Sequence, residues 1–227
     1  KILEVIVTSR EEAIEAEAGG ANRLELVRSP GQGGLTPRLE LVRQVAESVS
    51  IPVRIMLREN PSLSLANPNE MTILQSLAAD LASLPIDGLV LGFVRGDEID
   101  TVSTQAVLAA APGCRVTFHR AFEQALDPLA AIRSLKKIPQ IDRILTSGGA
   151  GAWPHRKTRL LEWQRAAAPE IKILVGAGLS STVMADVLAD PDLHEVHVGR
   201  GARIPHEYSG AVSRQQVARL RGASSRP

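Results

Sequence analysis

Eight short β-rich runs alternate with longer amphipathic runs, and this alternation restricts the possible folds more than any other feature of the chain. The runs lie at residues 2–8, 23–27, 53–58, 88–94, 115–120, 143–147, 172–177 and 195–199. Strand followed by helix, repeated eight times, predicts an α/β fold with a single parallel (β/α)8 TIM barrel. The alternative is a doubly wound open sheet, which usually has fewer strands, and the chain shows no dinucleotide-binding fingerprint of that fold.

One domain is enough for this chain. Its 227 residues suit one α/β barrel with a sizeable core, and no linker-like stretch divides them. We predict a TIM-barrel domain over residues 1–222 and a loose C-terminal tail over 223–227. The longest irregular stretch, residues 59–70, follows the third strand and is expected to form a loop at the active face, with a lid as one possible role.

Helix-start signals lie between the strands. A capping residue followed by glutamate, or by proline at the first helical position, is typical of a helix N-terminus. Such signals occur at Ser9 with Glu12, Thr36-Pro37, Asp127-Pro128, and Ser180 or Ser181.

Charge and composition exclude several classes of partner. The 26 Lys and Arg nearly balance the 25 Asp and Glu, and only 3% of the residues are aromatic. We therefore expect neither nucleic acid nor a membrane surface as a partner. Cys114 is the single cysteine, so no intramolecular disulfide can form, and no apolar run approaches the roughly 18 residues of a membrane span. A cytoplasmic protein is the expectation.

The alternation within the strands turns an unusual set of polar residues toward the barrel interior. In a barrel strand, alternate side chains point inward and outward, and most barrels fill the inside with Val, Ile and Leu. With the apolar positions facing the helices, the inward set includes Glu4, Arg23, Glu25, Arg54, Met56, Arg58, Thr117, His119, Glu195 and His197. Burying a charge is energetically unfavourable unless the charge is paired, so the presence of these polar residues in the interior requires an explanation.

Two explanations of the polar interior stay open. The set could be an ion-pair network that stabilises the barrel, or it could be a ligand-binding or catalytic site. His119, Glu4, Glu25 and Arg58 are the catalytic candidates, with acid–base work by His119 tuned by Glu4 or Glu25. Arg58, His119 and Arg120 come late in their strands, toward the functional face, whereas Glu4 and Glu25 lie deeper and could serve only to orient arginines.

Three consecutive strand ends carry glycine-rich segments, at 146–151, 176–181 and 199–203. The loops after the last two strands form the common phosphate site of this fold, because glycine lets backbone N–H groups approach an anion closely. The candidate anion-binding residues are Arg120, Ser147, Gly149, Gly178, His197 and Gly201. The alternative is that these glycines only make tight turns.

Other chemistries have less support in the sequence. No lysine lies late in a strand, as a Schiff-base enzyme would need, and no carboxylate cluster is evident for a divalent metal. Cys114 precedes the fifth strand, where we expect a small apolar residue near the barrel bottom.

Several motifs together resemble the CutC copper homeostasis family. They are "LEV" with Glu4, "GGANRLEL" (19–26), "GGLTP" (33–37), "VTFHRAF" (116–122) and "DRILTSGG" (142–149). The resemblance spans residues 2 to about 203 and implies a TIM barrel, a cytosolic homo-oligomer, such as a dimer, and a role in copper handling. It also implies these residues of interest: Glu4, Arg23, Glu25, Arg58, His119, Arg120, Asp142, Arg143, Thr146, Ser147 and His197.

The chain departs from the family at the positions that would bind copper. Family members often carry cysteines where this chain has Ile6 and Val27, and Cu(I) prefers thiolate or thioether ligands. Cys114 and Met56 are weak substitutes as Cu(I) ligands. Three functions therefore remain open: copper homeostasis, an enzyme acting on a small anionic or phosphorylated metabolite, and a non-catalytic binding or scaffold barrel.

Overall fold

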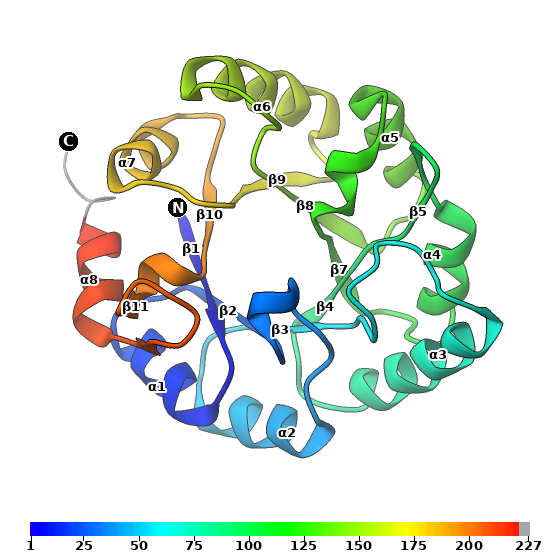
Figure 1. The fold of residues 1–227 in the computed structure, drawn as a ribbon, viewed down its shortest axis with the longest axis horizontal. Coiled ribbons are helices and arrows are strands. Elements are labelled where there is room, and N and C mark those ends of the chain that lie inside the picture. Colours follow the sequence, from blue (N-terminus) through cyan, green and yellow to red (C-terminus); the bar gives the residue numbers. More distant parts are fainter. Residues whose placement is uncertain (223–227) are drawn as a thin grey trace.

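Eight parallel strands close into one barrel, as the sequence predicts. The computed structural model describes residues 1–222. The barrel strands, in chain order, are β1 (Ile2–Val7), β2 (Arg23–Leu26), β3 (Val53–Met56), β4 (Gly88–Leu91), β7 (Arg115–Phe118), β8 (Ile141–Thr146), β9 (Lys172–Val175) and β10 (Glu195–Val198). Each pairs with its neighbours in chain order, and β10 closes the ring on β1 (Figure 1). The predicted tail, 223–227, lies outside the described residues.

Helices surround the barrel on its outer side (Figure 1). They are α1 (Arg10–Ala18), α2 (Leu39–Ser48), α3 (Pro68–Ala82), α4 (Thr101–Leu108), α5 (Pro128–Leu135), α6 (Trp153–Ala167), α7 (Ser181–Ala189) and α8 (Arg214–Gly222). None of the helices in residues 1–222 has the length and apolar character needed to cross a membrane.

Most of the predicted helix starts are confirmed. Ser9, Asp127 and Ser180 each accept a hydrogen bond from the backbone N–H three residues later. The start predicted at Thr36-Pro37 is wrong, because α2 begins at Leu39. The Thr36 hydroxyl instead bonds to the backbone of Arg58, at 2.9 and 3.0 Å, and so ties two loops together.

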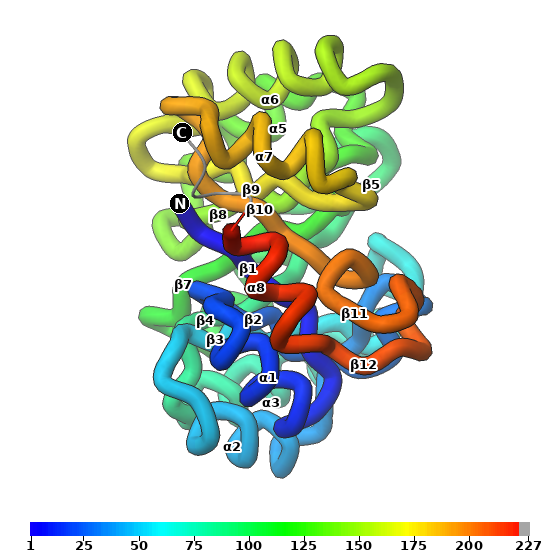
Figure 2. Tube along the Cα trace, turned by 90° about the vertical axis from the view of Figure 1, so that its left-hand side faces the viewer, coloured from blue at the N-terminus to red at the C-terminus, as the bar shows by residue number. Residues whose placement is uncertain are grey.

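Short elements gather at the C-terminal ends of the barrel strands. They are the 3-10 helices η1 (Pro30–Gln32), η2 (Arg120–Gln124) and η3 (Arg200–Ala202), and the hairpins β5 (Val94–Arg95)–β6 (Glu98–Ile99) and β11 (Arg203–Ile204)–β12 (Ala211–Val212). Figure 2 shows the β11–β12 hairpin at one end of the barrel and the start of β1 toward the other. The sequence analysis did not predict either hairpin.

Several predicted boundaries move at this end of the barrel, and for two of them the structure shows the cause. The fifth barrel strand ends at Phe118 rather than Arg120, because the His119 side chain accepts a hydrogen bond from the Ala121 N–H and starts η2 there. The predicted loop at 59–70 ends earlier, because Asn67 caps α3 and residues from Pro68 onward are helical.

The apolar core lies between the barrel and its helices. The outward-facing set on β1 and β2, which includes Leu3, Val5, Leu24 and Leu26, is at most 1% exposed and packs into this core. This placement confirms the predicted alternation and leaves the interior to the polar residues, since Glu4, Arg23, Glu25 and Arg54 are all buried.

Candidate functional site

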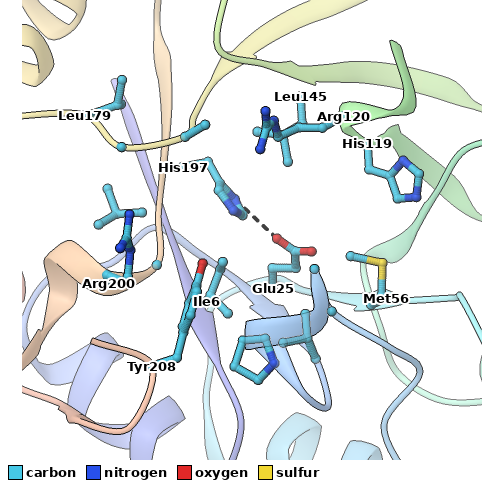
Figure 3. Close-up of a pocket in the computed structure, with 18 of the residues that line it drawn as sticks. Ile6, Glu25, Met56, His119, Arg120, Leu145, Leu179, His197, Arg200 and Tyr208 are labelled. Carbon is cyan, nitrogen blue, oxygen red and sulfur yellow. Dashed lines mark ion pairs between the residues drawn. The ribbon is translucent and has the colours of Figure 1, made fainter. Parts of the chain in front are cut away.

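A pocket of about 720 Å³ opens at the C-terminal ends of the barrel strands. A volume of this size fits a small organic ligand. Its polar lining includes Glu25, Arg58, His119, Arg120, Glu123, His197, Arg200 and Tyr208, and its apolar lining includes Ile6, Val27, Met56 and Leu145. Figure 3 shows Glu25, Met56 and His119 on one side of the pocket, with Arg200 and Tyr208 across from them.

Below this pocket, the interior holds a closed ion-pair network. Arg23 bonds to Glu4 and, at 2.7 Å, to Glu195, and the Glu195 carboxylate also accepts from Arg143 at 2.7 Å. Arg54, which is 0% exposed, donates to Asp142, Asp87 and Thr117. The ion-pair network predicted as one alternative is therefore present, in the deeper half of the barrel.

Glu25 is the interior carboxylate that this network leaves out. It is 2% exposed, and its Oε2 lies 3.3 Å from Nδ1 of His197. Burial raises the pKa of Glu25 to about 7; the His197 charge opposes the rise and the Glu4 charge adds to it. The prediction that Glu25 orients an arginine is wrong, since no guanidinium of the described residues lies within ion-pair distance of it, whereas Glu4 does pair with Arg23.

His197 links the network to the pocket. Its Nδ1 lies 2.7 Å from Oε1 of Glu4, closer than to Glu25. Burial would lower the pKa of His197, but the charges of Glu25 and Glu4 outweigh burial and raise it. Burial would likewise raise the pKa of Glu4, but Arg23 and His197 lower it below its usual range. A proton therefore resides readily within this cluster.

His119 is a neutral donor at the pocket wall. It is 5% exposed, and burial, followed by the Arg58 and Arg120 charges, lowers its pKa to about 3. Its Nδ1 accepts from the Ala121 N–H at 3.2 Å, so the ring proton lies on Nε2. The prediction that Glu4 or Glu25 tunes His119 is wrong, because these carboxylates face His197 from other strands.

The two arginines that follow strands at this face differ in their partners. Arg58 donates to the carbonyls of Gly33, Asn60 and Pro61, and it has no carboxylate partner among the described residues. Arg120 instead pairs with Glu123 at 2.6 Å. Of these two, only Arg58 therefore keeps an uncompensated positive charge beside the pocket.

The three glycine segments do not converge on one site. Gly178 and Gly201 line the pocket together with Arg200, which forms no ion pair within residues 1–222. Ser147 and Gly149 lie outside this lining, because the Ser147 N–H donates to Glu123 and the Gly149 N–H donates to Ser147 Oγ. Gly149 lines a separate cavity of about 300 Å³ beside Phe122 and Trp163.

One cluster has the donor atoms for a metal ion, contrary to the prediction that no such cluster exists. Glu4, Glu25 and His197 each offer one ligand atom, all within 4.8 Å of one another. The three residues come from different strands, so their proximity could not be predicted from their spacing in the sequence. Glu4 is already bound to Arg23 and to His197, so we interpret the group as a proton-sharing cluster rather than assign it as a metal centre.

The donors available to Cu(I) are few. Ile6 and Val27 form an apolar cluster with Met56 and Val90, where family thiols would stand. Met56 is the one sulfur-bearing residue in the pocket lining, and Cys114 is half-buried just before β7, at the opposite end of the barrel. This donor set does not suit Cu(I), which prefers sulfur ligands.

The pocket also contains residues that the sequence analysis missed. Arg200, His206 and Tyr208 come from η3 and from the hairpin that follows β10, and Glu123 comes from η2. Arg200 lies within the glycine segment at 199–203, which was the one signal available. The hairpin carries no periodic pattern from which its return over the pocket could be predicted.

Comparisons with known proteins agree with this architecture. The model of the CutC family matches residues 1–202. A CutC family protein of Vibrio vulnificus is 32% identical over 205 residues, which cover 88% of this chain and 82% of that protein. A human protein named as a copper homeostasis protein cutC homolog is 31% identical over 197 residues, covering 86% of this chain and 72% of its own.

A solved structure has the same fold. The crystal structure of a putative copper homeostasis protein CutC from Streptococcus agalactiae superposes with a TM-score of 0.79. It is 23% identical and covers 87% of this chain and 97% of its own.

Proposed function

Because this chain belongs to the CutC family, we propose that it has a role in copper homeostasis and that it acts through a small anionic ligand bound in the barrel pocket. The name of the human relative supports the first part. The second part rests on the pocket itself. Direct storage of Cu(I) has less support, because the pocket offers one thioether and no thiolate.

The observation that carries the proposal is positive charge without a carboxylate partner. Arg58 and Arg200 both line the pocket, and neither forms an ion pair with another of residues 1–222. Gly178 and Gly201 expose backbone next to Arg200, where N–H groups can approach an anion. Phosphate and carboxylate both suit such a setting, since the guanidinium group of arginine can bind either one through two hydrogen bonds.

Calorimetric titration with inorganic phosphate and phenyl phosphate tests anion binding directly. We expect saturable one-to-one binding that weakens as salt increases. The matched variants are Arg200→Gln, inside the pocket, and Arg43→Gln, on the exposed face of α2. Equal binding by all three proteins, or no binding by any of them, would overturn the anion site.

Copper binding has its own test. An anaerobic Cu(I) titration against a competing chelator, on the unmodified chain and on Cys114→Ser, should show no competition by either protein. Tight one-to-one binding that is lost in Cys114→Ser would place Cys114 in a copper site and contradict this account.

An enzymatic role is the second candidate function, because Glu25 has a pKa near neutrality and faces the pocket. The scaffold alternative has less support, because the interior is not wholly occupied by ion pairs. A homodimer and a cytoplasmic location also remain proposals, supported by the resemblance to the family. Light scattering on a size-exclusion column checks the first, and cell fractionation checks the second.

A further inference from the structure

Glu25 has the properties of a general base. Its carboxylate is buried at the pocket, and no guanidinium of residues 1–222 lies within ion-pair distance of it. Burial raises the pKa of Glu25 to about 7, so the base form and the acid form are both accessible near neutral pH. A group with this balance both accepts and returns a proton efficiently.

His119 complements this base. Its neutral ring directs Nδ1 at the Ala121 N–H, and no other hydrogen-bond partner of the ring occurs in the described part of the chain. The Nε2–H is therefore free to donate to a ligand oxygen in the pocket. A neutral imidazole stabilises a developing oxyanion without transferring its own proton fully.

The other residues that line the pocket restrict the reactions that it can catalyse. Among the described residues, no lysine and no cysteine line the pocket, so a Schiff base or a thioester has no nucleophile there. The apolar cluster of Ile6, Val27, Met56 and Val90 lies beside Glu25 and gives a ligand an apolar surface. A sugar-like ligand would leave its hydroxyl groups unpaired against these side chains.

Building on the anion site proposed above, we propose that the pocket removes a proton next to a carbonyl group in a small anion with an apolar body. Glu25 is the catalytic base, and His119 donates a hydrogen bond to the carbonyl oxygen. The phosphate or carboxylate group of the substrate lies toward Arg200 and Gly201, and its apolar part lies on Met56 and its neighbours.

The step needs no further reactant. A Glu25 oxygen takes the proton from the carbon next to the carbonyl, and the C–H electron pair becomes the new C=C bond. The carbonyl π pair moves to oxygen, and the resulting enolate accepts the Nε2–H bond of His119. Return of the proton from Glu25 to the same carbon restores the carbonyl group and regenerates the base, so the reaction class is enolisation, with hydrogen exchange or inversion at that carbon.

Exchange of substrate hydrogen with deuterium from D2O tests this proposal. The probes are 4-methyl-2-oxopentanoate and phenylpyruvate, two small anions with an apolar body, observed by proton NMR with and without protein. For at least one probe we expect exchange above the protein-free rate. That rate should rise with pH and level off above about 7, as Glu25 becomes ionised.

Three variants make the test specific. Glu25→Gln should lose the exchange, whereas Glu40→Gln, the same change at an exposed position on α2, should keep it. His119→Asn keeps an oxygen acceptor for the Ala121 N–H but lacks Nε2–H, so its rate should fall about a hundredfold. The pH profile of the unmodified chain keeps the test decisive if a variant fails to fold.

The outcomes separate this inference from the function on which it rests. Probes that bind calorimetrically but show no exchange would overturn the inference and leave the anion site standing. Exchange that persists in Glu25→Gln would also overturn it. If neither the probes nor the phosphates bind, both proposals fail.

Discussion

The two halves of the barrel interior are built from the same alternating strand positions, yet their charged side chains differ in their ion-pair partners. In the deeper half, the guanidinium groups of Arg23, Arg54 and Arg143 all have carboxylate partners. In the half that opens to the C-terminal ends of the strands, Glu25 lacks a guanidinium partner and Arg58 lacks a carboxylate partner. The arginine–carboxylate pairs stabilise the barrel, whereas Arg58, without a carboxylate partner, and Glu25, whose partner is the titratable His197, are placed to respond to a ligand.

The pKa values express the same difference. In the deeper half, burial would raise the pKa of Asp142, but the bonds from Arg54 and the charges of Arg54 and Arg143 lower it. At the pocket, burial dominates and raises the pKa of Glu25 to about 7. Asp142 thus stays ionised at neutral pH, whereas Glu25 titrates there.

The largest expected effect is on the deeper network. Arg54→Met leaves Asp142 and Asp87 without their buried partner, so the free energy of unfolding should fall by about 3 kcal/mol. Urea unfolding followed by circular dichroism measures this change. A loss below about 1 kcal/mol would show that the network does not stabilise the barrel.

The next effect is a change in the pH dependence of stability. In the folded state the pKa of Glu25 is about 7, above its ordinary value of 4.5. The contribution of Glu25 to the free energy of unfolding is therefore fully present below pH 4.5 and is lost as the pH rises through 7. Glu25→Gln removes this decline, so it should be more stable than the unmodified chain by about 3 kcal/mol at pH 8.5. The two proteins should converge toward pH 4.5, and parallel curves across this range would contradict the assignment.

A smaller effect concerns binding at the pocket rim. Arg200→Gln should weaken phenyl phosphate binding about tenfold, the loss of one charge-assisted hydrogen bond, because Arg200 is exposed and its charge is partly screened. Its unfolding free energy should not change. If Arg200→Gln lowers the stability but not the affinity, Arg200 has a structural role and does not bind the ligand.

The smallest effect is expected at the outer edge of the network. Arg115 is 66% exposed in its side chain and lies 3.8 Å from Asp87. Arg115→Met should cost about 0.5 kcal/mol or less, since exposed ion pairs contribute little. Measured beside Arg54→Met, it shows that burial, and not the presence of an ion pair, determines the cost.

The barrel and its polar interior could be predicted because both follow from residue spacing. Glu4 and Glu25 are turned inward by the apolar residues on either side of them, which pack against helices. The pairing of those side chains could not be predicted, because it depends on contacts between strands far apart in the sequence. Glu4 is 193 residues from His197, and Arg23 is 172 residues from Glu195.

The site could be predicted only in part, for the same reason. His119 and Met56 were placed correctly at the interior, and both line the pocket. Ser147 was grouped with Gly178 because both follow strands in glycine-rich segments, but the carboxylate of Glu123 takes the Ser147 N–H. Tyr208 was missed because it reaches the pocket from the β11–β12 hairpin, which no pattern in the chain announces.

A carbon-13 NMR titration of the glutamate carboxyl groups tests the contrast between the two halves most directly. The resonance of Glu25, identified by its loss in Glu25→Gln, should titrate with a midpoint near pH 7. Glu4, whose pKa is lowered by Arg23 and His197, should not titrate between pH 5 and 9, a window around that midpoint. A midpoint for Glu25 near its ordinary value of 4.5 would mean that its charge is compensated after all, and that the two halves do not differ.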